Sequence, residues 1–180
     1  MLLVSGVIVL MSVGGMRAQS SNPCAETNLP NPVLDMIRTK FSGWRPKNVA
    51  DLDAEDRELW LKPHLNDCPG IAVGHFESPD RLTYALLLVP QSNLSGGYKL
   101  VVFSKVPTGD GYVFKLVDHA SAAYSGLVIE KAPQGKYSDY EDARISVTIK
   151  LEGFYEEWIE KGALLYYWSG GRYKTVRVSG

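Results

Sequence analysis

The sequence predicts an α+β fold: an antiparallel meander sheet of about eight strands, curved or partly closed, with a small N-terminal helical layer. Two observations favour this fold. Apolar residues recur at helical spacing between residues 31 and 62, and strand-length apolar runs separated by glycine-containing turns follow from residue 71 onward. The 180 residues also include ten tyrosines, four tryptophans and seventeen glycines, a composition typical of sheets with tight turns.

The helical layer is expected in two pieces. The first begins at Asn31 as the capping residue, has Pro32 in its first turn and ends at Gly43. The second spans residues 53–61, where an acidic first turn suits the helix dipole and Pro63 ends the helix. Together they are expected to cover one end or face of the sheet.

The β-rich part covers residues 71–180. Strands are expected at residues 71–76, 82–90, 98–106, 112–118, 126–132, 145–151, 163–168 and 172–179. Residues 82–90 are almost wholly apolar, which predicts a central strand buried on both faces. Two segments do not fit the scheme: residues 132–144 are interpreted as a long polar loop, and residues 153–162 as a helical turn or a further strand.

The first residues predict export. An apolar run over residues 2–13 is shorter than the about 20 residues that span a bilayer, and small and polar residues follow it, as in a secretory signal. We expect residues 1–18 to be the signal peptide and residues 19–180 a single globular domain, secreted or periplasmic, with no stable membrane insertion. The alternative is a buried N-terminal helix or strand of a cytoplasmic protein, although Gly14 and Gly15 interrupt such an element.

Cys24 and Cys68 are the only two cysteines. In an oxidising compartment we expect them to form a disulfide. The closed loop of about 45 residues would stabilise the fold by roughly 4 kcal/mol in the chain-entropy model. The alternative is two free buried thiols.

Charge and motifs exclude several function classes. The net charge of −1, with acidic and basic residues mixed along the chain, argues against a nucleic-acid partner. The chain has no Gly-x-Ser-x-Gly motif, and its cysteines have no matching histidine pair for zinc. His64, His75 and His119 lie on different expected elements and predict no metal site. The sequence therefore favours a non-enzymatic protein without a cofactor or metal.

Two groups of side chains are the candidate binding residues. The first is an acidic, tyrosine-bearing stretch suited to enter a basic cleft on a partner, or else simply solvated: Tyr137, Asp139, Tyr140, Glu141 and Asp142. The second is Tyr167 and Trp168, which point to opposite faces of one strand. An exposed aromatic there suits protein or carbohydrate contact, and the alternative is cross-strand pairing that only stabilises the sheet.

Two segments resemble known families. Residues 68–77 (CPGIAVGHFE), followed by residues 84–88 (YALLL), resemble the opening of an FG-GAP-type blade. That family's calcium loop has several aspartates at alternate positions, whereas this chain has only Glu77 and Asp80 there, so calcium binding is not implied. Residues 166–173 (YYWSGGRY) resemble the terminal hairpin of small exported bacterial proteins of unknown function.

These observations predict an exported, non-enzymatic binding domain that recognises a protein partner, as an inhibitor or immunity-like module does. One alternative is an envelope structural component. Another is a small secreted hydrolase whose paired carboxylates come from Glu77, Asp80, Glu130, Asp139, Glu141, Glu156 and Glu157.

Overall fold

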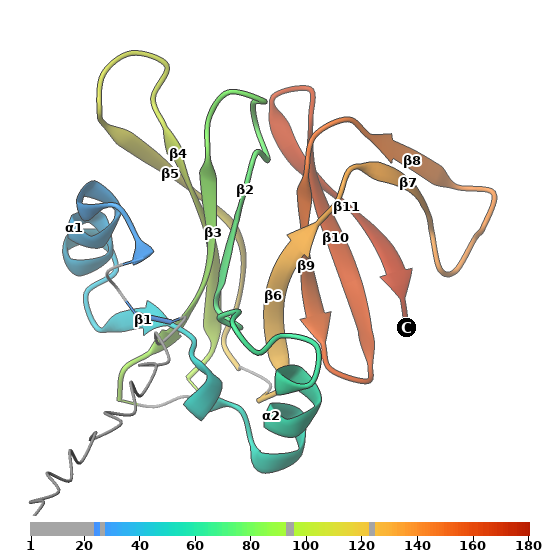
Figure 1. The fold of residues 1–180 in the computed structure, drawn as a ribbon, viewed down its shortest axis with the longest axis horizontal. Helices are drawn as coiled ribbons and strands as arrows, with labels where there is room; N and C mark the ends of the chain where they lie inside the picture. Colours follow the sequence, from blue (N-terminus) through green and yellow to red (C-terminus); the bar gives the residue numbers. More distant parts are fainter. Residues whose placement is uncertain (1–23, 26–27, 93–95, 123–124) are drawn as a thin grey trace, which may run out of the picture.

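The computed structural model describes residues 24–25, 28–92, 96–122 and 125–180. The expected signal peptide, residues 1–18, lies outside the described residues. Within them, eleven strands and two α-helices form two β-sheets, a separate hairpin and a helix beside each sheet (Figure 1). The fold is therefore α+β and mostly antiparallel, as predicted.

The first sheet, sheet A, has the strand order β1-β3-β4-β5, and β2 follows β1 along the same edge of β3. Its strands are β1 (Trp44–Pro46), β2 (Ile71–Gly74), β3 (Thr83–Pro90), β4 (Tyr98–Lys105) and β5 (Tyr112–Ala120). Strands β2 to β5 are consecutive antiparallel neighbours, as their short connections predict. Strand β3 is central and buried along most of its length, which confirms the prediction for residues 82–90.

The second sheet, sheet B, has the order β11-β10-β9-β6 and is also antiparallel. Its strands are β6 (Leu127–Ala132), β9 (Gly153–Trp158), β10 (Gly162–Ser169) and β11 (Arg172–Ser179). A hairpin of β7 (Gly135–Ser138) and β8 (Ser146–Ile149) lies between β6 and β9 in the sequence. Residues 132–144 therefore do not form one long loop, because they contain β7 and the hairpin turn.

The prediction of a single meander sheet, curved or partly closed, is wrong. Both sheets are open, and β6 pairs with β9 of sheet B instead of continuing sheet A beside β5. The physical reason is that β3 and β4 carry buried apolar side chains on both faces, so each face needs a separate covering layer. The eight expected strands appear as β2 to β6, β8, β10 and β11; the structure adds β1, β7 and β9.

A core cluster fills the space between the two sheets. It consists of Ala72, Phe76, Ala85, Leu87, Tyr98, Leu100, Val102, Leu127, Ile129, Phe154 and Tyr166. The outer face of sheet A is covered by α1 (Asn31–Lys40), which buries Val33 and Ile37 against it. The outer face of sheet B is covered by α2 (Ala54–Leu61), through Trp60, and by the β7–β8 hairpin. The two helices thus cover different sheets (Figure 1).

The helix boundaries follow local chemistry, with one correction. Asp53, which was expected in the first turn of α2, is its capping residue, because its side chain accepts a hydrogen bond of 2.9 Å from the backbone N–H of Asp56. In α1 the capping residue is Pro30 rather than Asn31, and no side chain caps the helix. Asn31 and Pro32 instead occupy the first turn, where the missing N–H of proline leaves no helical bond unmade.

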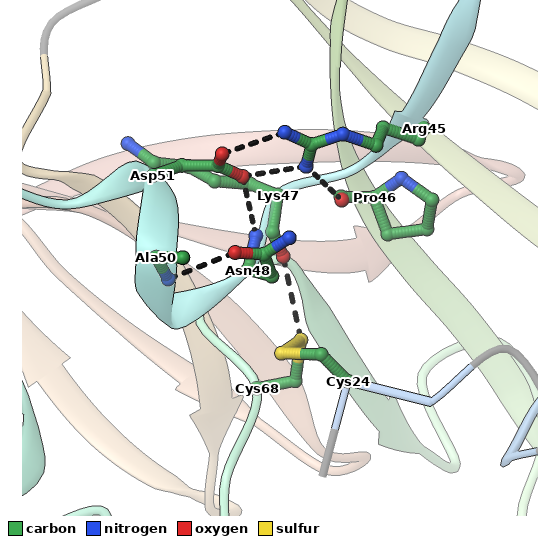
Figure 2. The surroundings of a disulfide bond; sticks show 8 residues. All are labelled: Cys24, Arg45, Pro46, Lys47, Asn48, Ala50, Asp51 and Cys68. Atoms are coloured by element: carbon green, nitrogen blue, oxygen red, sulfur yellow. Dashed lines mark hydrogen bonds and ion pairs between the residues drawn. A yellow bond between two sulfur atoms is a disulfide. The ribbon is translucent and has the colours of Figure 1, made fainter. Parts of the chain in front are cut away.

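The predicted disulfide between Cys24 and Cys68 is present. It joins the N-terminal part of the described chain to the segment that precedes β2 (Figure 2). The next two residues reach both sheets: Pro69 accepts a hydrogen bond from the Ile129 N–H of β6, and Gly70 accepts one from the Leu87 N–H of β3. The bridge therefore lies where the two sheets meet. No helix among the described residues is long and apolar enough to cross a membrane.

Candidate functional site

A cleft of about 430 Å³ lies where β5 of sheet A faces β10 and β11 of sheet B. Its lining includes Lys115, Asp118, Leu164, Tyr166, Tyr173 and Thr175. Side chains alternate along a strand, so Tyr173 and Thr175 share one face of β11, and Leu164 and Tyr166 share one face of β10. The cleft therefore combines apolar, aromatic and charged groups.

Two carboxyl groups meet at the base of this cleft. The Tyr166 hydroxyl donates a hydrogen bond of 2.8 Å to Glu156 Oε2, and the Tyr98 hydroxyl donates one of 2.9 Å to Asp118 Oδ2. Tyr166 also lies 3.3 Å from Asp118 Oδ2, so the nearest oxygens of the two carboxyl groups are at most about 6 Å apart. Glu156 is fully buried on β9, whereas Asp118 on β5 is partly exposed.

Glu156 and Asp118 have different surroundings. Burial, together with the charge of Asp118, raises the pKa of Glu156, and the hydroxyls of Tyr98 and Tyr166 offset only part of this effect. Glu156 Oε1 has no hydrogen-bond partner among the described residues, which also disfavours the charged form in an apolar core. Asp118 Oδ1 accepts a hydrogen bond of 2.8 Å from the backbone N–H of His119. Burial thus disfavours the charged form of Glu156, while the Asp118 side chain is held by the His119 backbone and by Tyr98.

The pKa values of the two tyrosines of the cluster are shifted in the same direction as that of Glu156. Burial, followed by the nearby Glu156 carboxyl, raises the pKa of both Tyr98 and Tyr166, so both hydroxyls stay protonated donors around neutral pH. The stacked rings of Tyr166 and Phe154, 5.2 Å apart, fix the direction of the Tyr166 hydroxyl. The two hydroxyls and the two carboxyl groups thus form a hydrogen-bonded cluster between the sheets.

The mouth of the cleft is aromatic. Trp168 and Tyr173 pack edge to face with ring centroids 5.1 Å apart. The Lys115 ammonium group lies 5.0 Å from the Trp168 ring centroid and forms an ion pair of 2.9 Å with Glu77. Burial and the neighbouring Glu77 raise the pKa of Tyr173. Trp168 therefore lies beside two residues of the cleft lining, Lys115 and Tyr173.

The acidic stretch predicted as a binding site forms part of the β7–β8 hairpin. Tyr137 packs against Tyr155, with ring centroids 6.3 Å apart, and its hydroxyl donates to the backbone oxygen of Pro133. Asp139 accepts hydrogen bonds from the backbone N–H groups of Glu141 and Asp142, so its carboxylate shapes the turn. Tyr137 and Asp139 therefore stabilise the hairpin.

The tip of the hairpin is held against β11. The Tyr140 N–H donates a hydrogen bond of 2.8 Å to the Arg177 backbone oxygen, while the Tyr140 side chain is 59% exposed. Asp142 pairs with Arg144 at 2.8 Å, and Glu141 lies 3.6 Å from Arg177. Two of the three acidic side chains, Glu141 and Asp142, thus already pair with arginines of the same chain.

Tyr167 and Trp168 lie on opposite faces of β10, as alternation predicts. Tyr167 packs against the apolar cluster beneath the hairpin, against which Tyr137 also packs. Trp168 packs against Tyr173, whose ring also contacts Phe154 of the core between the sheets. Tyr137 and Tyr167 therefore pack against the same cluster, whereas Trp168 packs on Tyr173 on the other face of β10.

The sequence analysis missed the pairing of Asp118 with Glu156. A strand over residues 153–158 places Phe154, Glu156 and Trp158 on one face, and this alternation was the signal that Glu156 points into the core. Nothing comparable marks Asp118, because a β-bulge opposite Leu100 and Val101 sets its direction.

The histidines occupy separate places. His64 Nε2 lies 2.6 Å from Glu130 Oε2, and its Nδ1 lies 3.1 Å from the Trp60 backbone oxygen. His75 lies 3.5 Å from Glu152. Within the described part of the chain, no group of three or more histidine, cysteine or acidic side chains could hold a metal ion.

A buried lysine lies beside the disulfide. The Lys47 ammonium group donates hydrogen bonds to the backbone oxygens of Ser125 and Leu127, the latter at 2.8 Å. Burial lowers the pKa of Lys47 to about 8, although three nearby aspartates, Asp51 foremost, oppose this shift. Figure 2 shows that Asp51 also binds Arg45 through two hydrogen bonds of 2.6 Å and that the Lys47 backbone oxygen lies beside Cys68. This cluster connects β1 to β6.

The chain matches no family model, no curated protein and no solved structure. The segment that resembles an FG-GAP-type blade forms β2 and the first part of β3, which pair antiparallel with Ile71 opposite Leu86. The relationship to that family stays a prediction.

Proposed function

We propose that the chain is an exported, non-enzymatic domain that binds a protein partner, as an inhibitor or immunity-like module does. The observation that carries this proposal is the cleft between β5 and β10–β11, which is lined in part by Tyr166 and Tyr173, with Trp168 packed against Tyr173. Preorganised aromatic side chains are the groups that most often supply binding energy at protein interfaces. The disulfide between Cys24 and Cys68 supports export, because disulfides persist in oxidising compartments.

The state of the carboxyl pair favours binding over catalysis. A catalytic acid or base must come within hydrogen-bond reach of the substrate. Glu156 is fully buried behind Tyr166, and Asp118 already accepts hydrogen bonds from Tyr98 and from the His119 N–H. The two carboxyl groups are therefore better placed to join the two sheets than to react with a substrate.

The hairpin tip is the second proposed contact surface. Tyr140 is exposed, and Asp139, Glu141 and Asp142 surround it with negative charge. Their pairs with arginines are at the surface, where such pairs contribute little and can be exchanged for a partner's basic groups. Tyr137 and Tyr167 would act by holding this tip in place.

Affinity capture tests the function. The domain over residues 19–180 is immobilised and exposed to the native envelope fraction or medium, and captured proteins are identified by mass spectrometry. We expect the wild-type domain to capture a protein that Trp168→Ala or Tyr140→Ala captures less. The control Leu65→Ala, at an exposed apolar position shortly after α2, should capture it equally. The proposal fails if the wild-type domain enriches no protein.

One observation favours a second candidate, a hydrolase with paired carboxyl groups. The observation is that Asp118 and Glu156 both contact the Tyr166 hydroxyl beside the cleft, and a pair of neighbouring carboxyl groups is what glycoside hydrolases use. The assay is release of reducing sugar from envelope polysaccharide by the wild-type domain and by Asp118→Asn. Activity that Asp118→Asn abolishes would establish the hydrolase, and no release by either protein would leave binding as the function.

A further inference from the structure

His64 lies just after α2, the helix that Figure 1 shows beside sheet B, and contacts β6 through its ring. Its Nδ1 lies 3.1 Å from the Trp60 backbone oxygen, and its Nε2 lies 2.6 Å from Glu130 Oε2. A backbone carbonyl and an ionised carboxylate can only accept hydrogen bonds. Both ring nitrogens therefore face acceptors, and the two hydrogen bonds together need a proton on each nitrogen.

This arrangement holds one proton more than a neutral imidazole beside a carboxylate. If that proton passes to a base in solution, one ring nitrogen is left with a lone pair directed at an oxygen atom, whichever tautomer forms. The count is the same if the shared proton lies on Glu130, because closely coupled groups titrate as a pair. The contact between His64 and Glu130 is therefore complete only in its protonated state.

The groups around the ring suit a positive charge. The Trp60 indole stacks on the imidazole of His64, with ring centroids 4.1 Å apart, and aromatic faces attract cations. The Trp60 carbonyl belongs to the last turn of α2, where the helix dipole favours positive charge. Glu157 of β9 is a second carboxyl group beside the pair: burial, followed by the charge of Glu130, raises the pKa of Glu157, and the charge of His64 opposes this shift.

Other titratable groups near the pair come from each surrounding element. They are Tyr155 on β9, Lys131 on β6, Asp67 after α2, and Lys62 and Glu58 at the end of α2. Lys131 pairs with Glu152 at 3.1 Å, and Lys62 pairs with Glu58 at 3.4 Å. Both lysines are therefore directed to other carboxylates, and His64 is the cation described beside Glu130.

The turn over residues 62–67 depends on His64 for its attachment to sheet B. The turn is fixed before its start by the buried Trp60 and after its end by Cys68, which is buried and bound in the disulfide. Apart from the ring of His64, the hydrogen bonds and ion pairs described for this turn stay within residues 58–67. The ring is thus the polar link from the turn to the sheet.

We propose that His64 is a pH-sensitive switch, which holds the turn over residues 62–67 against sheet B when its ring carries both protons and releases the turn when the ring is neutral. Histidine side chains change charge between about pH 5 and 8. Because the attached state binds the extra proton, the attachment weakens as the pH rises through this range. This switch does not rest on the proposed binding function, since His64 and Glu130 lie outside the lining of the cleft between β5 and β10–β11.

Release of the turn would alter a second cavity. Asn66 and Asp67 of the turn line a cavity of about 460 Å³, together with Glu130 and residues of β2. One wall of this cavity is therefore formed by the segment that His64 holds in place. Protonation of a single ring would thus set the shape of the cavity.

The test measures amide hydrogen exchange in the full chain by NMR at about pH 5.5 and about pH 8. The amides of Lys62, His64 and Asp67 each donate a backbone hydrogen bond in or next to the turn, so they report its opening. Exchange rates are divided into those of the unfolded chain at the same pH, which gives protection factors. The ring nitrogen shifts of His64 record its protonation at each pH.

The variants separate His64 from its neighbours. In His64→Gln the side-chain amide can donate to Glu130 at either pH, and in Glu130→Gln the amide can donate to a neutral ring. His75→Gln is the matched control, because His75 also lies beside a glutamate, at 3.5 Å from Glu152. Glu157→Gln removes the other carboxyl group near the ring. Thermal unfolding confirms that each variant is folded.

We expect the protection of the three amides to fall at least about threefold from the lower to the higher pH in the wild type. The fall should disappear in His64→Gln and shrink in Glu130→Gln, and it should persist in His75→Gln and Glu157→Gln. An unchanged protection in the wild type, or a fall of the same size in His64→Gln, would overturn the switch. So would loss of the fall in Glu157→Gln, since the titrating group would then be that carboxyl.

Discussion

The Tyr166 hydroxyl donates a hydrogen bond of 2.8 Å to Glu156, whose carboxyl group is fully buried between the two sheets. Tyr166 belongs to β10 and Glu156 to β9, and Asp118 from β5 of the other sheet lies on the far side of the same hydroxyl. The protonation state of Glu156 therefore influences the stability of the contact between the two sheets at the cleft.

Replacing Glu156 with glutamine tests this influence. The folded-state pKa of Glu156 is raised above its ordinary value of 4.5, so its contribution to stability is present below pH 4.5 and is lost as the pH rises through the folded pKa. Glutamine keeps an acceptor for Tyr166 and does not ionise. We expect the free energy of unfolding of Glu156→Gln, relative to wild type, to increase from pH 4.5 upward in urea titrations.

The matched control for this change is Glu160→Gln, which alters an exposed carboxyl group just after β9. Its stability should follow that of the wild type at every pH. A Glu156→Gln difference that stays constant with pH would contradict the assignment of a raised pKa.

Removing the disulfide should lower stability substantially. The Cys24–Cys68 bridge spans a sequence separation of 44 residues, for which the chain-entropy model gives about 4 kcal/mol. We expect the double change Cys24→Ser with Cys68→Ser to lose about that much free energy of unfolding in urea. Reduced wild-type protein should behave like the double variant, and a loss below about 1 kcal/mol would indicate that the bridge adds little constraint.

Gly70 is a position where a side chain does not fit. A Cβ atom there would lie 2.3 Å from the Lys47 backbone oxygen and 2.5 Å from its nitrogen. Both obstacles are backbone, so we expect Gly70→Ala to lower the free energy of unfolding by about 2 kcal/mol or more. Gly111→Ala is the control, because its nearest neighbour would be the Val106 side chain at 3.5 Å, and its effect should stay within about 0.5 kcal/mol.

Because of Lys47, we expect the free energy of unfolding to rise in alkaline solution. Its pKa is about 8 in the folded protein and 10.5 ordinarily, so between these values the unfolded chain binds more protons. Stability linked to Lys47 should therefore rise with pH over this range, by up to about 3 kcal/mol. We expect this rise to disappear in Lys47→Met and to persist in the exposed control Lys62→Met. An unchanged profile in Lys47→Met would show that the ammonium group does not titrate near pH 8.

Local patterns in the sequence predicted several elements because the determining physics is local. The Asp53 cap depends on a hydrogen bond three residues away, and the burial of β3 follows from an uninterrupted apolar run. The disulfide was predicted from the presence of two cysteines and from the expectation of export. None of these depends on which strands become neighbours.

The pairing of strands could not be read in the same way. The short connection after β5 is compatible with a hairpin, but β6 pairs with β9, because that arrangement covers the inner faces of both sheets. The candidate site depends on this choice, since Asp118 and Glu156 approach each other only when sheet A packs on sheet B.

The position of the β7–β8 hairpin bears on how this protein can vary during evolution. Ala132, the last residue of β6, and Gly153, the first of β9, are direct partners in sheet B. The hairpin between them therefore leaves and re-enters the sheet at a single point, like an insertion into a simpler β-turn-β unit. Insertions at such sites change little else in a fold. The acidic tip can thus change in length or sequence while the register of sheet B is preserved, whereas β7 and β8 are held by the apolar cluster that they share with sheet B.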